Sequence, residues 1–180
     1  MRALRWSIMP DERTHEIRAA RATDSHQLHR LITKHAVFER AKASLSVNQL
    51  ERLLEAGDQP AMILVAAEKH ELIGYAALTF DFSLWRARRW AHLDCLFVEE
   101  QHRGKSVGRD LLEEVRRAAR NAGADRLEGQ TPHWNEPGIA FYVREGATVA
   151  QKARFYFDIS TGIPSQSPAG SSRLSKLPTT

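Results

Sequence analysis

Two side chains in the middle of the sequence are of types that move protons during group transfer. Asp94 stands on an otherwise apolar segment, Leu93–Val98, where a carboxylate is costly unless it has a partner or a chemical task. We therefore take Asp94 as the candidate base, acting directly or through a water, with a hydrogen-bonded structural aspartate as the alternative. His92 and His133 are rival bases with suitable pKa. Tyr142 carries a phenol that is protonated at neutral pH and can serve as an acid, although it could also be a core tyrosine.

A glycine-containing turn follows the same apolar segment and leads directly into an amphipathic helix. Backbone N–H groups in such a turn converge on one point, and the helix N-terminus adds its positive dipole end. The turn therefore predicts a site for a phosphate or pyrophosphate. Its spacing matches neither the Walker loop nor the dinucleotide-binding turn. The residues concerned are Arg103, Gly104, Lys105, Ser106, Val107 and Gly108, followed by Arg109.

The elements that must position these residues can be predicted from periodicity and capping signals. Strands are expected over 16–20, 61–66, 72–80, 90–98 and 126–130, and a closing hairpin or bent strand over 148–159. Helices are expected from 23 or 24 to 36, from 46 to 57, from 107 to 121 and from 136 to 145. The strand over 126–130 should run parallel to its predecessor across a right-handed crossover. The predicted fold class is α/β with a mixed sheet, and not a doubly wound one.

The turn and a downstream segment together resemble the GCN5-related N-acetyltransferase (GNAT) family. The family's pyrophosphate loop reads R/Q-x-x-G-x-G/A, and 103–108 matches it except that Ser106 replaces the middle glycine. The segment 134–142, with Trp-Asn-Glu-Pro and Phe-Tyr, resembles the family's later strand end and next helix. Within the family the text is most similar to diamine acetyltransferases, in Gly74-Tyr75-Ala76, in 80–85 and in Leu93-Asp94, where those enzymes usually carry Glu.

The resemblance covers roughly residues 16–160 and implies a site as well as a fold. It implies a mostly antiparallel sheet in which two central parallel strands splay apart around acetyl-CoA. None of the eight histidines stands at metal-ligand spacing from a Cys or a carboxylate, so we expect no metal. Contacts to the cofactor are expected from the 103–109 turn, from the strand backbone, from Asn135 and from Tyr142, which matches the family's usual general acid. Asn135 could equally be a helix N-cap. The strand backbone residues are Leu96, Phe97 and Val98.

The acceptor implied by this resemblance is a small primary amine. A polyamine-like cation favours carboxylates and aromatic faces. The candidates for its site are Phe38, Glu39, Asp81, Trp85, Asp94 and Trp134. The same residues would suit an aminosugar antibiotic of the aminoglycoside type. A non-catalytic module that binds CoA or nucleic acid is the alternative from a different class.

Composition limits the remaining possibilities. The 180 residues predict one domain over 15–161, an N-terminal extension over 1–14 and a disordered tail over 162–180, which is poor in apolar residues. No apolar stretch is long enough to span a membrane. The single Cys95 fits a reducing cytoplasm and is expected to be a buried, inert thiol. The net charge of +4 can attract CoA phosphates as readily as nucleic acid, which is the less favoured partner. We expect a homodimer.

Overall fold

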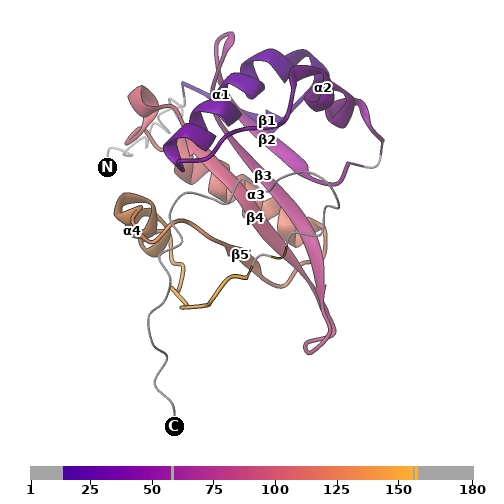
Figure 1. Ribbon diagram of the computed structural model, residues 1–180, viewed down its shortest axis with the longest axis vertical. Coiled ribbons are helices and arrows are strands. Elements are labelled where there is room, and N and C mark those ends of the chain that lie inside the picture. Colours follow the sequence, from indigo (N-terminus) through magenta and orange to yellow (C-terminus); the bar gives the residue numbers. More distant parts are fainter. Residues whose placement is uncertain (1–13, 58, 156, 158–180) are drawn as a thin grey trace, which may run out of the picture.

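A five-stranded mixed sheet forms the centre of the protein (Figure 1). The structure is a computed structural model that describes residues 14–57, 59–155 and 157. The strands lie side by side in chain order, and each neighbouring pair is antiparallel except the last, which is parallel. They are β1 Glu16–Ala19, β2 Met62–Glu68, β3 Glu71–Ser83, β4 Arg88–Val98 and β5 Leu127–Gly129. The predicted mixed sheet is confirmed.

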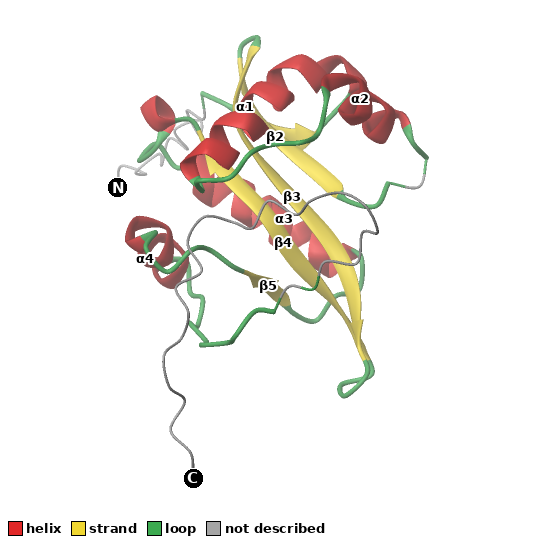
Figure 2. Cartoon of the chain, in the orientation of Figure 1, coloured by secondary structure: helices red, strands yellow, loops and turns green. Residues whose placement is uncertain are grey.

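Helices cover both faces of this sheet (Figure 2). Two of them, α1 Ser25–Phe38 and α2 Val47–Glu55, pack on one face, and α3 Val107–Asn121 packs on the other. The fourth, α4 Glu136–Arg144, lies on the β5 side of the molecule. Short 3₁₀ turns at Ala22–Asp24 and Glu100–His102 precede α1 and the turn before α3. Among the described residues, every helix is too short or too polar to span a lipid bilayer.

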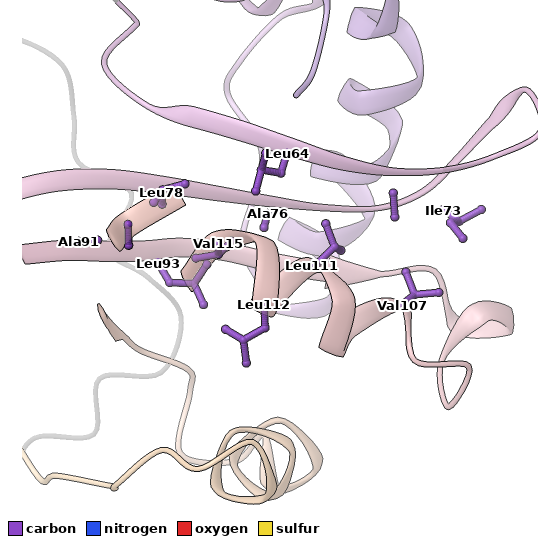
Figure 3. Close-up of a cluster of buried hydrophobic side chains, with 12 residues drawn as sticks. Leu64, Ile73, Ala76, Leu78, Ala91, Leu93, Val107, Leu111, Leu112 and Val115 are labelled. Carbon is purple, nitrogen blue, oxygen red and sulfur yellow. The ribbon is translucent and has the colours of Figure 1, made fainter. Parts of the chain in front are cut away.

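Alternating side chains of the strands build a hydrophobic core on each face of the sheet. Helix α3 buries residues spaced three or four apart, which is one face of a helix. The cluster on its side contains Leu64, Ala66, Ile73, Ala76, Leu78, Ala91, Leu93, Val107, Leu111, Leu112, Val115 and Ala119 (Figure 3). The cluster under α1 and α2 contains Leu28, Leu31, Leu50, Leu54, Ile63, Val65, Leu72, Tyr75, Ala77 and Phe97.

Strand β4 changes its side-chain alternation at Asp94. Leu93 belongs to the core under α3, and simple alternation would send Cys95 to the same face. The pairing instead moves from Leu93 opposite Leu78 to Cys95 opposite Ala77, which leaves Asp94 with no opposite residue. Cys95 therefore packs with the cluster under α1 and α2. This is a β-bulge, a feature that re-aims side chains and is frequent beside active sites.

One predicted element does not form in the described residues. Residues 148–155 and 157 adopt no strand, although a closing strand was predicted over 148–159. Val149, Phe155 and Phe157 are exposed, so the apolar alternation that predicted a strand faces no partner within this part of the chain. An alternating pattern becomes a strand only where a neighbouring strand pairs with it. The predictions for 1–13 and for the tail 162–180 lie outside the described residues.

Candidate active site

The turn before α3 presents the first backbone amides of that helix. The first helical hydrogen bond runs from the Asp110 N–H to the Ser106 carbonyl, at 3.0 Å, so the amides of residues 107–109 have no partner within the helix. Gly104 and Ser106 both have positive φ, 75° and 63°, in the left-handed region. Lys105 is exposed beside them. Amides, dipole and cation together fit a phosphate group.

Strand β4 has an open edge next to this turn. The parallel pairing of β4 with β5 ends at Leu93 opposite Gly129. Beyond that point, over residues 94–98, the edge of β4 that faces away from β3 has no strand partner in the described part of the chain. Backbone N–H and C=O groups on such an edge must find other partners, and an extended ligand can supply them. The predicted cofactor contacts Leu96, Phe97 and Val98 lie on this stretch.

Arg103 connects the turn to the C-terminal end of β4. Its Nε donates a hydrogen bond to the Val98 carbonyl, at 3.0 Å. Its guanidinium carbon lies 5.4 Å from the centre of the Phe38 ring and 5.8 Å from that of Phe97. The side chain is thus turned toward α1, so the turn and the end of α1 meet at this residue. The residues present at the turn and along β4 fit acetyl-CoA.

Asn135 and Tyr142 lie at the start and near the end of α4. Asn135 is the N-cap: its Oδ1 accepts a hydrogen bond from the Gly138 N–H at 3.2 Å, and its Nδ2 donates to Thr131 Oγ1 at 2.7 Å. The Tyr142 ring packs edge-on against Phe141, with 5.2 Å between ring centres, and against the core under α3.

The Tyr142 hydroxyl titrates only at high pH. Burial is the main cause that raises its pKa, to about 12, and the negative charges of Glu39 and of an ionised Cys95 add to it. Both groups are therefore close enough to act on the phenol, although they come from α1 and β4. At neutral pH the phenol is fully protonated and can donate a proton.

The candidate base Asp94 reaches solvent from the bulge of β4. Its side chain is 60% exposed, so this carboxylate avoids the desolvation expected for a residue on an apolar strand. One oxygen lies 4.0 Å from His92 Nε2, and the other accepts a hydrogen bond from the Cys95 thiol at 3.5 Å. The predicted base thus has a histidine beside it, which keeps His92 available as a second proton acceptor.

The end of α1 meets the segment before α4 on the same side of the sheet. Phe38 and Trp134 lie 5.7 Å apart between ring centres, and the Arg40 guanidinium lies 4.6 Å above the Trp134 ring. Glu39 follows Phe38 at the end of α1 and is 38% exposed. The predicted acceptor residues Phe38, Glu39 and Trp134 therefore come from two segments that are in contact, and the charge of Asp94 acts on His35 of α1.

Two predicted acceptor residues lie elsewhere. Asp81 pairs with Trp90 near the far end of the β3–β4 hairpin, which is roughly 13 Å along β4 from Asp94 at about 3.3 Å per residue. Trp85 is at the hairpin tip and is fully exposed. Asp81 and Trp85 do not lie near Glu39 and Tyr142, because the β3–β4 hairpin extends beyond the site and its tip is distant from it.

Two polar residues next to the site, His35 and Tyr75, were not predicted as site residues, and neither was the hydrogen bond from Cys95 to Asp94. His35 Nδ1 lies 2.8 Å from the Tyr75 hydroxyl, and its Nε2 lies 3.6 Å from Glu39. Burial raises the pKa of Cys95 to about 12, so the thiol is protonated at neutral pH, as an inert thiol should be. The spacing of His35 and Glu39, four residues apart on one helix, was the available signal. Among the described residues, no group of His, Cys, Asp and Glu could hold a metal ion.

This chain is similar to known acetyltransferases. The thialysine N-ε-acetyltransferase of Mus musculus is 29% identical over 143 residues, which cover 73% of this chain and 82% of that protein. The uncharacterized N-acetyltransferase YhfO of Bacillus subtilis (strain 168) is 29% identical over 130 residues, covering 72% and 87%. An aminoglycoside acetyltransferase from an uncultured soil metagenomic sample, solved with sisomicin, shares the fold with a TM-score of 0.69 at 17% identity, covering 82% of this chain and 97% of that one. The family model for the acetyltransferase (GNAT) family matches residues 17–147, so this protein belongs to that family and is an acetyltransferase.

Proposed function

We propose that this acetyltransferase moves the acetyl group of acetyl-CoA to a primary amine of a small cationic acceptor by direct attack. The observation that carries the proposal is the protonated Tyr142 phenol, within electrostatic reach of Glu39 and of Cys95, which lies on the open stretch of β4. An acid, an acceptor carboxylate and a free strand edge thus converge at one place. No nucleophile of the enzyme is needed for this reaction, because positioning supplies much of the rate.

Acetyl-CoA would be bound by the turn before α3 and by the open stretch of β4. The amides of residues 107–109 and the cations Lys105 and Arg109 would hold the pyrophosphate. Backbone groups of Leu96, Phe97 and Val98 would hold the extended arm and polarise the acetyl carbonyl. When bound, acetyl-CoA supplies a thioester carbonyl with a thiolate leaving group. Asn135 is already bonded on both sides, so we assign it mainly to setting the start of α4.

The acceptor amine would be bound by two carboxylates, one at the end of α1 and one on β4. An ammonium group would be bound by Glu39 and Asp94, with Phe38 and Trp134 as aromatic walls. The amine must lose a proton before it attacks, and Asp94 would take it, directly or through a water toward His92. Tyr142 would then protonate the departing thiolate, which its protonated state at neutral pH permits.

The acceptor class is supported by relatives and by charge. The similar mammalian protein carries thialysine in its name, and thialysine presents a primary amine on a flexible chain. A binding role toward nucleic acid is less well supported, because several arginines are engaged by acidic residues, in the pairs Arg86–Asp125, Arg117–Glu114 and Arg126–Glu128. An aminoglycoside remains the second candidate acceptor, since the acetyltransferase solved with sisomicin has this fold.

The test is thiol release from acetyl-CoA with a panel of amines. Spermidine, thialysine, lysine and gentamicin represent the cationic candidates, and a neutral amide and zwitterionic taurine, which carries a sulfonate, serve as controls. We expect turnover with at least one cationic amine and an amine KM that rises about tenfold in Asp94→Asn, with the acetyl-CoA KM nearly unchanged. Equal turnover of the neutral or zwitterionic controls would refute a carboxylate-lined acceptor site.

A further inference from the structure

A buried polar chain of three side chains lies between α1 and the sheet, next to the proposed acceptor site. His35 projects from α1 with a side chain only 12% exposed, and its ring stacks on Phe97 with 5.2 Å between ring centres. Its Nδ1 lies 2.8 Å from the hydroxyl of Tyr75, a residue of β3 that is 2% exposed. The Tyr75 hydroxyl also interacts with the thiol of Cys95 on β4.

Each end of this chain is a carboxylate of the proposed acceptor site. At one end, His35 Nε2 lies 3.6 Å from Glu39 Oε1, one helical turn further along α1. At the other end, the Cys95 thiol donates to Asp94 Oδ2 at 3.5 Å. Polar groups buried in an otherwise apolar core are retained only where they are bonded or have a role. Here the bonds lead to the two groups that would bind the amine.

The surroundings of the ring favour one tautomer of His35. A carboxylate can only accept, so we place the proton on Nε2, which faces Glu39 at 3.6 Å. Nδ1 is then an acceptor, and the Tyr75 O–H donates to it. Burial lowers the pKa of His35, against the opposing charges of Glu39 and Asp94 and with a contribution from Arg103, so the ring is neutral at neutral pH.

We propose that His35 is a positioning residue for the acceptor: held by Tyr75, its neutral imidazole orients Glu39 toward the amine. This inference rests on the proposed function. A proton added to His35 would cancel much of the negative charge offered to an ammonium group, so amine binding should weaken at acid pH. The charged and titratable groups that face the ring are Glu39, Tyr75, Asp94, Cys95 and Arg103.

The kinetic test compares three variants at His35 and Tyr75 with a control on the same helix. His35→Leu should raise the amine KM about tenfold or more while the acetyl-CoA KM stays within about twofold. His35→Gln keeps a donor for Glu39 and should restore part of the amine affinity. Tyr75→Phe removes the donor that stabilises the neutral ring, so the pH below which the amine KM rises should move upward. His29→Leu is the control, because His29 contacts the Leu45 carbonyl and is not one of the three polar side chains His35, Tyr75 and Cys95.

A second test does not depend on turnover. Nitrogen NMR of the imidazoles should show His35 with its proton on Nε2 and with a pKa below that of an ordinary histidine. Saturating spermidine or lysine should lower that pKa further, since a bound ammonium opposes protonation of the ring. A proton on Nδ1, or a His35→Leu variant that changes only the melting temperature, would overturn the inference. If no cationic amine is turned over, the proposed function fails, and the NMR titration still decides whether His35 responds to a bound amine.

Discussion

At the scale of single residues, Tyr142 is held in the protonated form by its surroundings. Burial and nearby negative charge raise its pKa to about 12, so its acid form should persist to the upper end of any practical pH range. Tyr142→Phe should lower kcat about 10²-fold or more with little change in acetyl-CoA affinity, as the loss of a general acid predicts. Steady-state kinetics at saturating substrates, with calorimetry of CoA binding, would measure both. Turnover equal to that of the unaltered enzyme would remove Tyr142 from the mechanism.

Ser106 adopts a backbone conformation that favours glycine. Its φ of 63° is left-handed, a conformation that costs a non-glycine residue about 1–2 kcal/mol. Ser106→Gly should therefore stabilise the protein by about 0.5–1 kcal/mol in a urea titration, the strain relieved being partly offset by the greater flexibility of glycine in the unfolded chain. Lys105→Gly is the matched control, since Lys105 is not among the described residues with positive φ, and it should not be stabilising. A destabilised Ser106→Gly would mean that the serine side chain contributes more than its backbone strain costs.

At the scale of elements, the N-terminus of α3 is the expected anchor of the cofactor. A Cβ at Gly108 would lie 3.5 Å from the Phe141 ring, an ordinary contact, so Gly108→Ala should fold and bind normally. Gly108→Asp adds a negative charge beside the free amides of residues 107–109, which should repel a phosphate, and the acetyl-CoA dissociation constant should rise at least about tenfold, which is 1.4 kcal/mol. Calorimetry that finds equal CoA affinity in both folded variants would disprove the assignment of this turn.

The link between β1 and α1 depends on a buried ion pair. Asp24 receives two hydrogen bonds from Arg18, at 2.6 and 2.9 Å, and one from the Arg21 N–H, and the Arg18 bond is the main cause of its lowered pKa. Asp24→Asn should cost about 1–3 kcal/mol of unfolding free energy at pH 7. Because the pKa is lower in the folded state, this stability is present above the unfolded value of about 3.9 and is lost as pH falls through the folded value.

Denaturant titrations from pH 7 to pH 2 would test this linkage. The curves for the unaltered protein and for Asp24→Asn should converge at the acid end. Asp125→Asn is the control, since the Asp125 carboxylate pairs with Arg86 at an exposed site and should matter much less. A difference that stays constant with pH would mean that the charge of Asp24 is not the stabilising feature.

At the scale of the whole molecule, large apolar side chains near the end of the described part of the chain are exposed. Phe155 and Phe157 are 78% and 84% exposed, in a segment whose alternation is typical of a strand. We expect a second copy of the chain to cover them in a homodimer, since burial of large aromatic side chains stabilises association. Sedimentation equilibrium should show a dimer, and Phe155→Ser with Phe157→Ser should shift it toward monomer. The exposed Trp85→Ser at the opposite hairpin tip is the control, and a monomer at all concentrations would contradict the expectation.

The order of elements was predictable because its signals are local. The Ser46 cap, the apolar stripe of α3 and the glycine turn before it each depend on residues close in sequence, and each appears in the structure as predicted. The predicted strand over 148–159 has no counterpart in its described residues. Its pattern is also local, but a strand needs a partner that the pattern does not specify.

By itself, the sequence determined the family, the glycine turn before α3 and the types of side chain available for acid–base chemistry. Only the tertiary structure decided which of them meet. The bulge at Asp94 turns Cys95 toward α1, and the chain from Glu39 through His35 and Tyr75 exists because a helix and two strands pack together. The hairpin carries Trp85 away from that place. These outcomes depend on which distant segments lie side by side, and packing between segments leaves no periodic signal in a single sequence.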